Sequence, residues 1–374
     1  EVASLTGAWR DLFHGAAEAN PFYGPDFLLP LLTLGGKLAR ARFLLLWSGN
    51  VLAGLCPILP RRFGLPGLGA SLATLGHDYI FNGLPLMRAG FEPRASSALL
   101  DGLEAEYGRG RLMIGASPLD GPVAAGLKLA LAASGRAHLV LDASERAGIT
   151  VSGTAEAHLA RVKGPALAKL RRNERELGEL GKLGFRAARS GDALAEAVEA
   201  FIALEARGWK GRQGTALASH PATVALARQA LASGGDAPAP RAELLTLDER
   251  PIGIFLHLVS DGYSATFKIA HDEEFARQAP GVLTMLNSLK GLLAEPWTKR
   301  LDSGAAPEHA VGAVWRDRFP SGRLLSALSR RQSERELRLA AGIESLATSL
   351  RTGARDAYYG LARRKRTQTR KMKA

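Results

Sequence analysis

The most constraining feature of this sequence is the order of patterns between residues 192 and 328. An amphipathic helix over Asp192–Arg207 precedes three short alternating runs, which are separated by the turns Asp248–Pro251 and Ser260–Gly262. Helix and strand patterns then alternate. We expect strands over 242–247, 252–259 and 263–269, a helix over 281–293, a strand over 300–303, a helical turn over 311–318 and a strand over 324–328. This order predicts an α/β (α+β) fold.

The same order resembles the second half of the GNAT-type acyltransferase fold. The first part of the chain repeats it in weaker form, from a helix at Asp26, through the hairpin turn Ser48–Asn50, to a strand over 137–141. A chain of 374 residues also exceeds one usual core. We therefore expect tandem GNAT-like acyl-CoA N-acyltransferase domains over 1–165 and 166–329, followed by a basic helical tail over 330–374.

The net charge of +13 is concentrated at the end of the chain. Residues 330–374 contain 13 Lys and Arg against 4 Asp and Glu, so the tail carries +9 and the preceding 329 residues only +4. This distribution argues against nucleic acid as a partner of the globular part. No run approaches the ~18 apolar residues of a membrane span. A single cysteine, Cys56, excludes an internal disulfide framework and a Cys-based zinc site, and nothing in the sequence predicts a bound metal. We expect a cytoplasmic protein.

A turn that opens directly into a predicted helix is the candidate cofactor site. Glycine at a helix start lets backbone N–H groups approach a phosphate, and the helix N-terminus favours negative charge. Gln278, followed by Gly281 three residues later, partly matches the pyrophosphate loop of GNAT enzymes, which binds coenzyme A. We expect the pyrophosphate at Gly281, Val282 and Leu283. The alternative is a Pro-Gly turn that only caps the helix.

A second candidate segment joins glycines to basic residues after the 192–207 helix. Glu205 is followed by Trp209, Lys210 and Arg212, with glycines at 208, 211 and 214. Such a loop can close over an acidic or phosphorylated ligand. We expect these four side chains on the acceptor side of the cleft, with Arg212 and Lys268 recognising an anion. The alternative is a helix end with Trp209 packed on the core.

Acid–base candidates lie at the ends of two expected strands. Acyl transfer needs a base, donors for the oxyanion, and an acid for the leaving thiolate. Asp302, at the end of the 300–303 strand, is the first candidate and His271 the second. Lys268 would bind an anionic acceptor or stabilise developing charge. Each residue alone also fits an ordinary surface or salt-bridged position.

Several segments together resemble the BioF2-like acetyltransferase family, which includes the CelD (BcsL) cellulose-biosynthesis proteins and is related to the FemAB peptidoglycan aminoacyltransferases. The hallmark segment is Leu204–Glu205 with Gly208–Ala216. Further matches are Lys268, Ala279–Gly281, Leu301–Gly304, Asn20–Phe22 and His77–Tyr79. The resemblance implies acyl transfer from acetyl-CoA or another acyl-CoA to an amine or hydroxyl of a sugar or polysaccharide precursor, in exopolysaccharide or cellulose-type biosynthesis.

Two other functions remain open. A FemAB-like aminoacyl-tRNA-dependent transferase would need a basic RNA-binding surface, which the globular charge of +4 disfavours. A catalytically inert GNAT-like scaffold of a polysaccharide machine is compatible with the incomplete pyrophosphate loop.

The tail predicts an amphipathic helix over 334–361 that leads into seven basic residues without an acid. Apolar residues recur at helical spacing at Leu339, Ile343, Leu346, Leu350, Ala357 and Leu361. The basic residues are Arg363, Arg364, Lys365, Arg366, Arg370, Lys371 and Lys373. This pattern is typical of electrostatic attachment to the anionic inner face of a membrane or to a polysaccharide-synthesis partner. The alternative is a solvated terminus.

Overall fold

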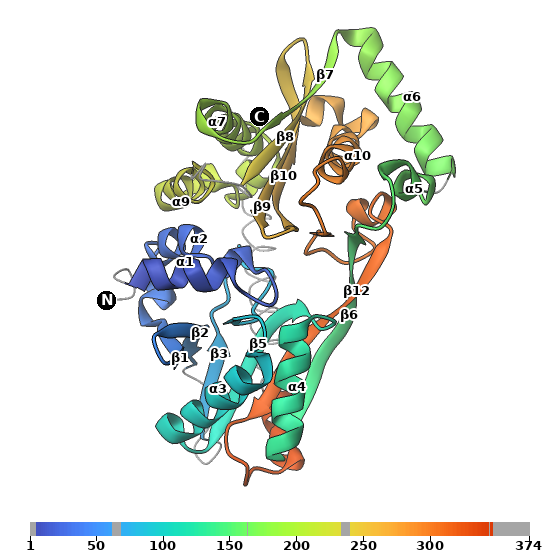
Figure 1. Cartoon of the computed structure of the whole chain (residues 1–374). Helices are drawn as coiled ribbons and strands as arrows, with labels where there is room; N and C mark the ends of the chain where they lie inside the picture. The colour runs from blue at the N-terminus through green and yellow to red at the C-terminus, as the bar shows by residue number, and fades with distance from the viewer. Residues whose placement is uncertain (1–4, 62–68, 163, 233–239, 344, 347–374) are drawn as a thin grey trace, which may run out of the picture.

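The computed structural model describes residues 5–61, 69–162, 164–232, 240–343 and 345–346 (Figure 1). Its first half runs through α1 (Thr6–His14), η2 (Pro21–Tyr23), α2 (Pro25–Leu32), η3 (Gly36–Arg40), β1 (Arg42–Ser48), β2 (Val51–Pro60), β3 (Ala70–Thr74), β4 (Leu86–Met87), α3 (Glu92–Tyr107), β5 (Gly110–Pro118), α4 (Pro122–Ser134) and β6 (His138–Thr150).

The second half repeats this order after a helical connection. It runs through α5 (Ala155–Ala160), α6 (Gly164–Leu180), β7 (Leu183–Ala188), α7 (Gly191–Arg207), α8 (Trp209–Gln213), η4 (Leu217–Ser219), α9 (Pro221–Ala232), β8 (Arg241–Leu247), β9 (Arg250–Ser260), β10 (Tyr263–His271), η5 (Glu273–Gln278), α10 (Pro280–Leu293), β11 (Arg300–Asp302), η6 (Ala310–Ala313) and β12 (Asp317–Ala327). The expected α/β class and its internal repetition are confirmed.

One mixed sheet runs through both halves of the described chain. Its strand order is β1-β2-β3-β5-β12-β6-β11-β10-β9-β8-β7, with β4 paired to β2. In each half two antiparallel strands are followed by a third strand, and this third strand pairs in parallel with the strand beyond the next α-helix. The parallel pairs are β3 with β5 and β10 with β11. α3 and α10 make these two crossovers. The repetition is therefore one of topology.

The halves exchange strands at the centre of the sheet. The end of β12 pairs with β5 of the first half, and the start of β12 pairs with the end of β6. That end of β6 also pairs with β11, so both long strands serve both halves (Figure 1). Two expectations are corrected here. The strand expected over 324–328 begins at Asp317, where a helical turn was expected, and the strand expected to end at Leu141 continues to Thr150.

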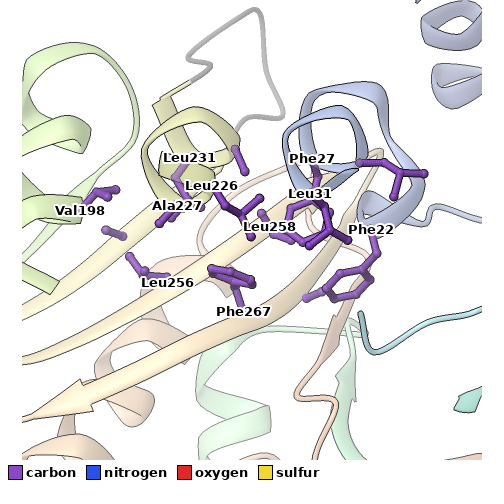
Figure 2. Close-up of a cluster of buried hydrophobic side chains, with 14 of the residues drawn as sticks. Phe22, Phe27, Leu31, Val198, Leu226, Ala227, Leu231, Leu256, Leu258 and Phe267 are labelled. Atoms are coloured by element: carbon purple, nitrogen blue, oxygen red, sulfur yellow. The ribbon is translucent and has the colours of Figure 1, made fainter. Parts of the chain in front are cut away.

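A hydrophobic core also crosses between the halves. Phe27 and Leu31 of α2 face Leu226 and Leu231 of α9 above β9 and β10 (Figure 2). The Phe27 and Phe267 rings meet edge to face with centroids 5.8 Å apart. Since these side chains are buried, separating the halves would expose a large apolar area to water.

A partly buried carboxyl group lies where the first half meets β11. Glu18, in the segment after α1, accepts a hydrogen bond from the Val123 N–H at the start of α4, 3.3 Å away. Its carboxylate occupies the space where a side chain at Gly121 would begin. Burial raises the pKa of Glu18 from 4.5 to about 7, although Arg300 acts in the opposite direction. Glu18 therefore favours the protonated form in the folded protein.

We expect Glu18→Gln to stabilise the protein at alkaline pH. A folded pKa above the unfolded one gives a contribution that is complete below pH 4.5 and lost as the pH rises through 7. The variant abolishes this loss, so its free energy of unfolding should exceed that of the wild type by about 3 kcal/mol at pH 8 and match it near pH 4.5. Urea denaturation at both pH values measures this. The exposed Glu106→Gln is the control, and equal gains at both pH values would contradict the prediction.

Candidate functional site

The sheet opens beside β10, and this opening creates the site. β10 and β11 pair only from Tyr263 with Arg300 to Ala265 with Asp302, whereas β10 continues to His271. The pairing of β10 with β9 also shifts register between Thr266 and Lys268. Such a bulge bends a strand and re-aims its side chains. The far end of β10 thus has no β11 partner on that side.

A pocket of about 260 Å³, open to solvent, lies at the end of β10. Its walls come from the end of α7, from α8 and from the segment that follows β10. The lining residues are Leu204, Glu205, Gly208, Trp209, Lys210, Ile269, Ala270, His271 and Glu273. The structure thus brings together four of the predicted residues, namely Glu205, Trp209, Lys210 and His271.

Glu205 is the centre of a buried ionic cluster at this pocket. Its side chain is 1% exposed. One carboxylate oxygen lies 2.8 Å from Lys268 Nζ and 3.2 Å from Lys210 Nζ, and the other accepts the Leu217 N–H at 2.8 Å. Lys210 also donates to the Ile269 carbonyl at 3.2 Å. Two ammonium groups share one carboxylate, so the cluster carries a net charge of +1.

The electrostatics of Lys268 follow from its burial. Burial lowers the pKa of Lys268, Glu205 opposes that effect, and Lys210 adds to it. A lysine in this setting is a compact donor that loses little solvation when it binds an anion. The predicted role of Lys268 as an anion-binding or charge-stabilising group is therefore compatible with its surroundings.

Tyr79 contacts Lys268 from a distant part of the chain. Its ring comes from the first half and lies against Lys268, with Nζ 5.3 Å from the ring centroid. The segment His77–Tyr79 contributes to the family resemblance. No local pattern indicates that it meets a strand almost 190 residues later.

Arg212, which we expect to recognise an anion together with Lys268, pairs with a carboxylate other than Glu205. Its guanidinium pairs with Glu273 at 2.6 Å, and Glu273 also accepts the Trp209 N–H at 2.6 Å. Arg212 therefore fixes α8 onto the start of η5, while Lys268 pairs with Glu205. Trp209 is 48% exposed at the pocket, so it is not packed in the core.

The expected pyrophosphate loop has fewer free donors than the sequence indicated. Ala279 adopts a left-handed conformation and its carbonyl accepts the N–H groups of both Val282 and Leu283. Gln278 is held against α6, because its carbonyl accepts the Asn173 amide at 3.0 Å. Leu283 is buried in the core. Of the three expected donors, the N–H of Gly281 remains available at the start of α10.

Asp302 is enclosed where the sequence predicted an open strand end. One oxygen accepts the Tyr263 hydroxyl at 2.7 Å and lies 3.5 Å from Arg146, and the other accepts the Gly304 N–H at 2.8 Å. The residue is 1% exposed, and burial together with Asp302 raises the pKa of Tyr263 well above its usual value. The pocket lining includes His271 but neither Asp302 nor Lys268; Lys268 contacts the lining residue Glu205.

We expect Glu205→Gln to be strongly destabilising, because a neutral amide leaves the two partly buried ammonium groups of Lys210 and Lys268 without a counter-charge. Loss of one partner from a buried ionic cluster typically costs about 3–5 kcal/mol. Urea denaturation of the variant measures it. Glu199→Gln is the matched control, since Glu199 lies on the same helix and pairs with Arg228 at the surface, where ion pairs contribute little. Similar losses in the two variants would refute the central role of Glu205.

Comparisons with known proteins agree with the fold. Residues 166–310 match the family model described as an acetyltransferase (GNAT) domain. No curated protein sequence matches the chain. Among solved structures, FemX is similar with a TM-score of 0.58 and 13% identity, covering 86% of this chain and 95% of its own.

Two further structures share the fold. One is the C-terminal domain (DUF2156) of a candidate lysylphosphatidylglycerol synthetase from Agrobacterium fabrum, with a TM-score of 0.54, 11% identity, and coverage of 91% of this chain and 95% of its own. The other is a protein of unknown function from Bacteroides thetaiotaomicron, with a TM-score of 0.54, 9% identity, and coverage of 87% and 97%. Residues 166–310 form a GNAT acetyltransferase domain, and the protein is an N-acyltransferase.

Proposed function

We propose that the protein transfers an acyl group from acyl-CoA to an amine or hydroxyl of an acceptor that carries an anionic group. The observation that carries this proposal is the cluster of two lysines on the single carboxylate of Glu205, at the open end of β10. The cluster has one uncompensated positive charge beside a pocket. An anionic group of the acceptor would supply the missing charge.

The opening between β10 and β11 suits the donor. Beyond Ala265 the β11 side of β10 is free of strand pairing, so the extended thioester arm of acyl-CoA could lie along it. The N–H of Gly281 and the positive end of α10 would face its pyrophosphate. A Cβ added at Gly281 would lie 3.3 Å from His271 Nδ1, which shows how closely the helix start approaches the pocket.

His271 is the proton acceptor that this geometry favours. The acceptor nitrogen or oxygen attacks the thioester carbonyl, its proton passes to His271, and the new bond forms to the carbonyl carbon. The carbon–sulfur bond then breaks and the thiolate leaves with a proton returned by His271. Lys268 donates to the oxyanion that forms between these steps. Asp302 holds Tyr263 and the Gly304 turn beneath the site.

The resemblance to BioF2-like and CelD proteins supports a sugar or polysaccharide precursor as the acceptor. The exposed ring of Trp209 at the pocket suits the apolar face of a sugar. Arg212 would act through α8, which it fixes by its pair with Glu273.

The test is His271→Gln, which we expect to lower kcat for acetyl transfer from acetyl-CoA to an amine-bearing sugar by about 10²–10⁴-fold with an unchanged melting temperature. His220→Gln, at an exposed histidine after η4, is the matched control. Full activity of the His271 variant would remove this residue from the mechanism. A thermal-shift screen with acetyl-CoA, longer acyl-CoAs and RNA tests the donor. Stabilisation by RNA alone favours the aminoacyl-tRNA-dependent transferase. No stabilisation by any of these ligands favours an inert scaffold.

We also propose that the C-terminal tail attaches the enzyme to an anionic membrane surface. Residues 334–343 are helical, and Leu337 and Ala340 pack inward while Leu339, Ile343 and Leu346 are exposed. The seven basic residues of the tail lie outside the described residues, as does most of the predicted helix. Among the described helices, none has the length and apolar character to cross a bilayer. Near anionic lipid each basic residue contributes on the order of 1 kcal/mol.

Co-sedimentation with phosphatidylserine vesicles tests the attachment. A chain ending at Leu350 keeps the packed Leu337 and loses the basic residues, so it should sediment much less than the full chain at low salt. High salt should release the full chain as well. Equal sedimentation of the two chains would leave the tail as a solvated terminus.

A further inference from the structure

The parallel strand pairs of the two halves end differently. β10 outruns β11 in the second half, whereas β5 outruns β3 in the first. In the first half, β3 and β5 pair in parallel as β10 and β11 do in the second. In the second half the pocket lies where the chain leaves the end of β10. In the first half the segment 75–85 that leaves β3 turns back onto β5.

Segment 75–85 packs directly against the end of β5. The Gly83 N–H donates to Ser117 Oγ and the Gly115 N–H donates to Thr74 Oγ1, both at 2.9 Å. A Cβ added at Gly83 would lie 2.9 Å from the Gly115 nitrogen, so only backbone fits between these glycines.

The segment is fixed from its other side as well. Asn20 Nδ2 donates to the carbonyls of Leu84 at 2.7 Å and Asn82 at 3.3 Å, and Asn20 is buried. The Phe22 and Phe81 rings meet edge to face with centroids 5.6 Å apart. These contacts make the segment a rigid support, because buried polar groups that lose a partner are costly.

From this support Tyr79 reaches the site of the second half. The Tyr79 ring packs against Phe267 with centroids 5.8 Å apart, and its face lies 5.3 Å from Lys268 Nζ. Burial raises the pKa of Tyr79 to about 12, so its ring stays neutral. Phe81 lies close to Gly304, after the end of β11, so the same segment covers two strands of the second half.

We propose that Tyr79 is a positioning residue for Lys268, supplied by the first half to complete the site of the second. Besides burial, three neighbouring groups act on the Lys268 ammonium: Glu205 of α7 attracts it, Lys210 of α8 repels it, and the Tyr79 ring face stabilises it. Because Glu205 is shared with Lys210, the ring supplies part of the stabilisation that a second carboxylate would give. The catalytic use of Lys268 rests on the proposed function, whereas the contact itself does not.

The test measures Lys268 directly. Its reactivity with an amine-specific acetylating reagent, followed by peptide mass spectrometry between pH 7 and pH 11, gives the midpoint of its titration. In Tyr79→Leu we expect this midpoint to fall by about half a unit, a threefold change in the acid constant, because the ammonium loses the ring face. Tyr79→Phe should keep the wild-type midpoint. Tyr107→Leu is the matched control, since Tyr107 lies under Arg42 far from Lys268 in the fold.

An unchanged midpoint in Tyr79→Leu, or an equal fall in Tyr79→Phe, would overturn the proposal. Tyr79→Met keeps most of the side-chain volume without a ring and serves if the leucine variant does not fold. With acetyl-CoA and an amine acceptor, Tyr79→Leu should lower kcat about tenfold while Tyr79→Phe retains it. If the Lys268 midpoint shifts in Tyr79→Leu but the wild-type protein transfers no acyl group, the positioning role is upheld and the proposed function is refuted. Normal acyl transfer by Tyr79→Leu with an unchanged Lys268 midpoint would support the proposed function and refute the positioning role of Tyr79.

Discussion

The pairing of β6 with β12 is the interaction on which the rest of the molecule depends. It joins two sheets into one and places the parallel pairs β3–β5 and β10–β11 on either side of the junction. The site lies where β10 outruns β11, so its shape depends on β11 being held against β6 on its other edge. The apolar contact between α2 and α9 then fixes how the halves face each other. Without that fixed relation Tyr79 could not lie against Lys268.

The burial of Glu205 with two lysines beside the pocket gives the candidate site its positive charge and is unfavourable for folding unless the carboxylate is paired. A carboxylate as buried as Glu205 is tolerated because two ammonium groups and a backbone N–H satisfy it. The arrangement leaves one ammonium group more than the carboxylate neutralises. Asp302 is stabilised differently, because its oxygens accept hydrogen bonds from a hydroxyl and a backbone N–H and lie near a single cation, Arg146. Of these two buried carboxylates, only Glu205 lines the pocket.

The sequence predicted best what is local. The strands expected over 242–247, 252–259 and 263–269 match β8, β9 and β10 closely, because alternation and turn residues act within a few positions. The end of β6 was missed because Asp142, Glu145 and Arg146 do not look like a strand, and their partners lie in β12. The sequence makes Glu205, Lys210 and Lys268 separate candidates, but the sharing of the Glu205 carboxylate by the two lysines depends on tertiary contacts. The enclosure of Asp302 by Tyr263 was hidden for the same reason.

The strand exchange has a consequence for how this chain is made. Residue 327 pairs with residue 111, so the sheet of the first half is incomplete until residue 327 has left the ribosome. Until then β5 and β6 have an unfilled gap between them, with unpaired backbone groups on both sides. Domain-by-domain folding during synthesis, the usual route for a chain of this size, cannot finish here. The first half must wait in a partly folded state, and its central strands are the surfaces that a chaperone would have to protect from aggregation.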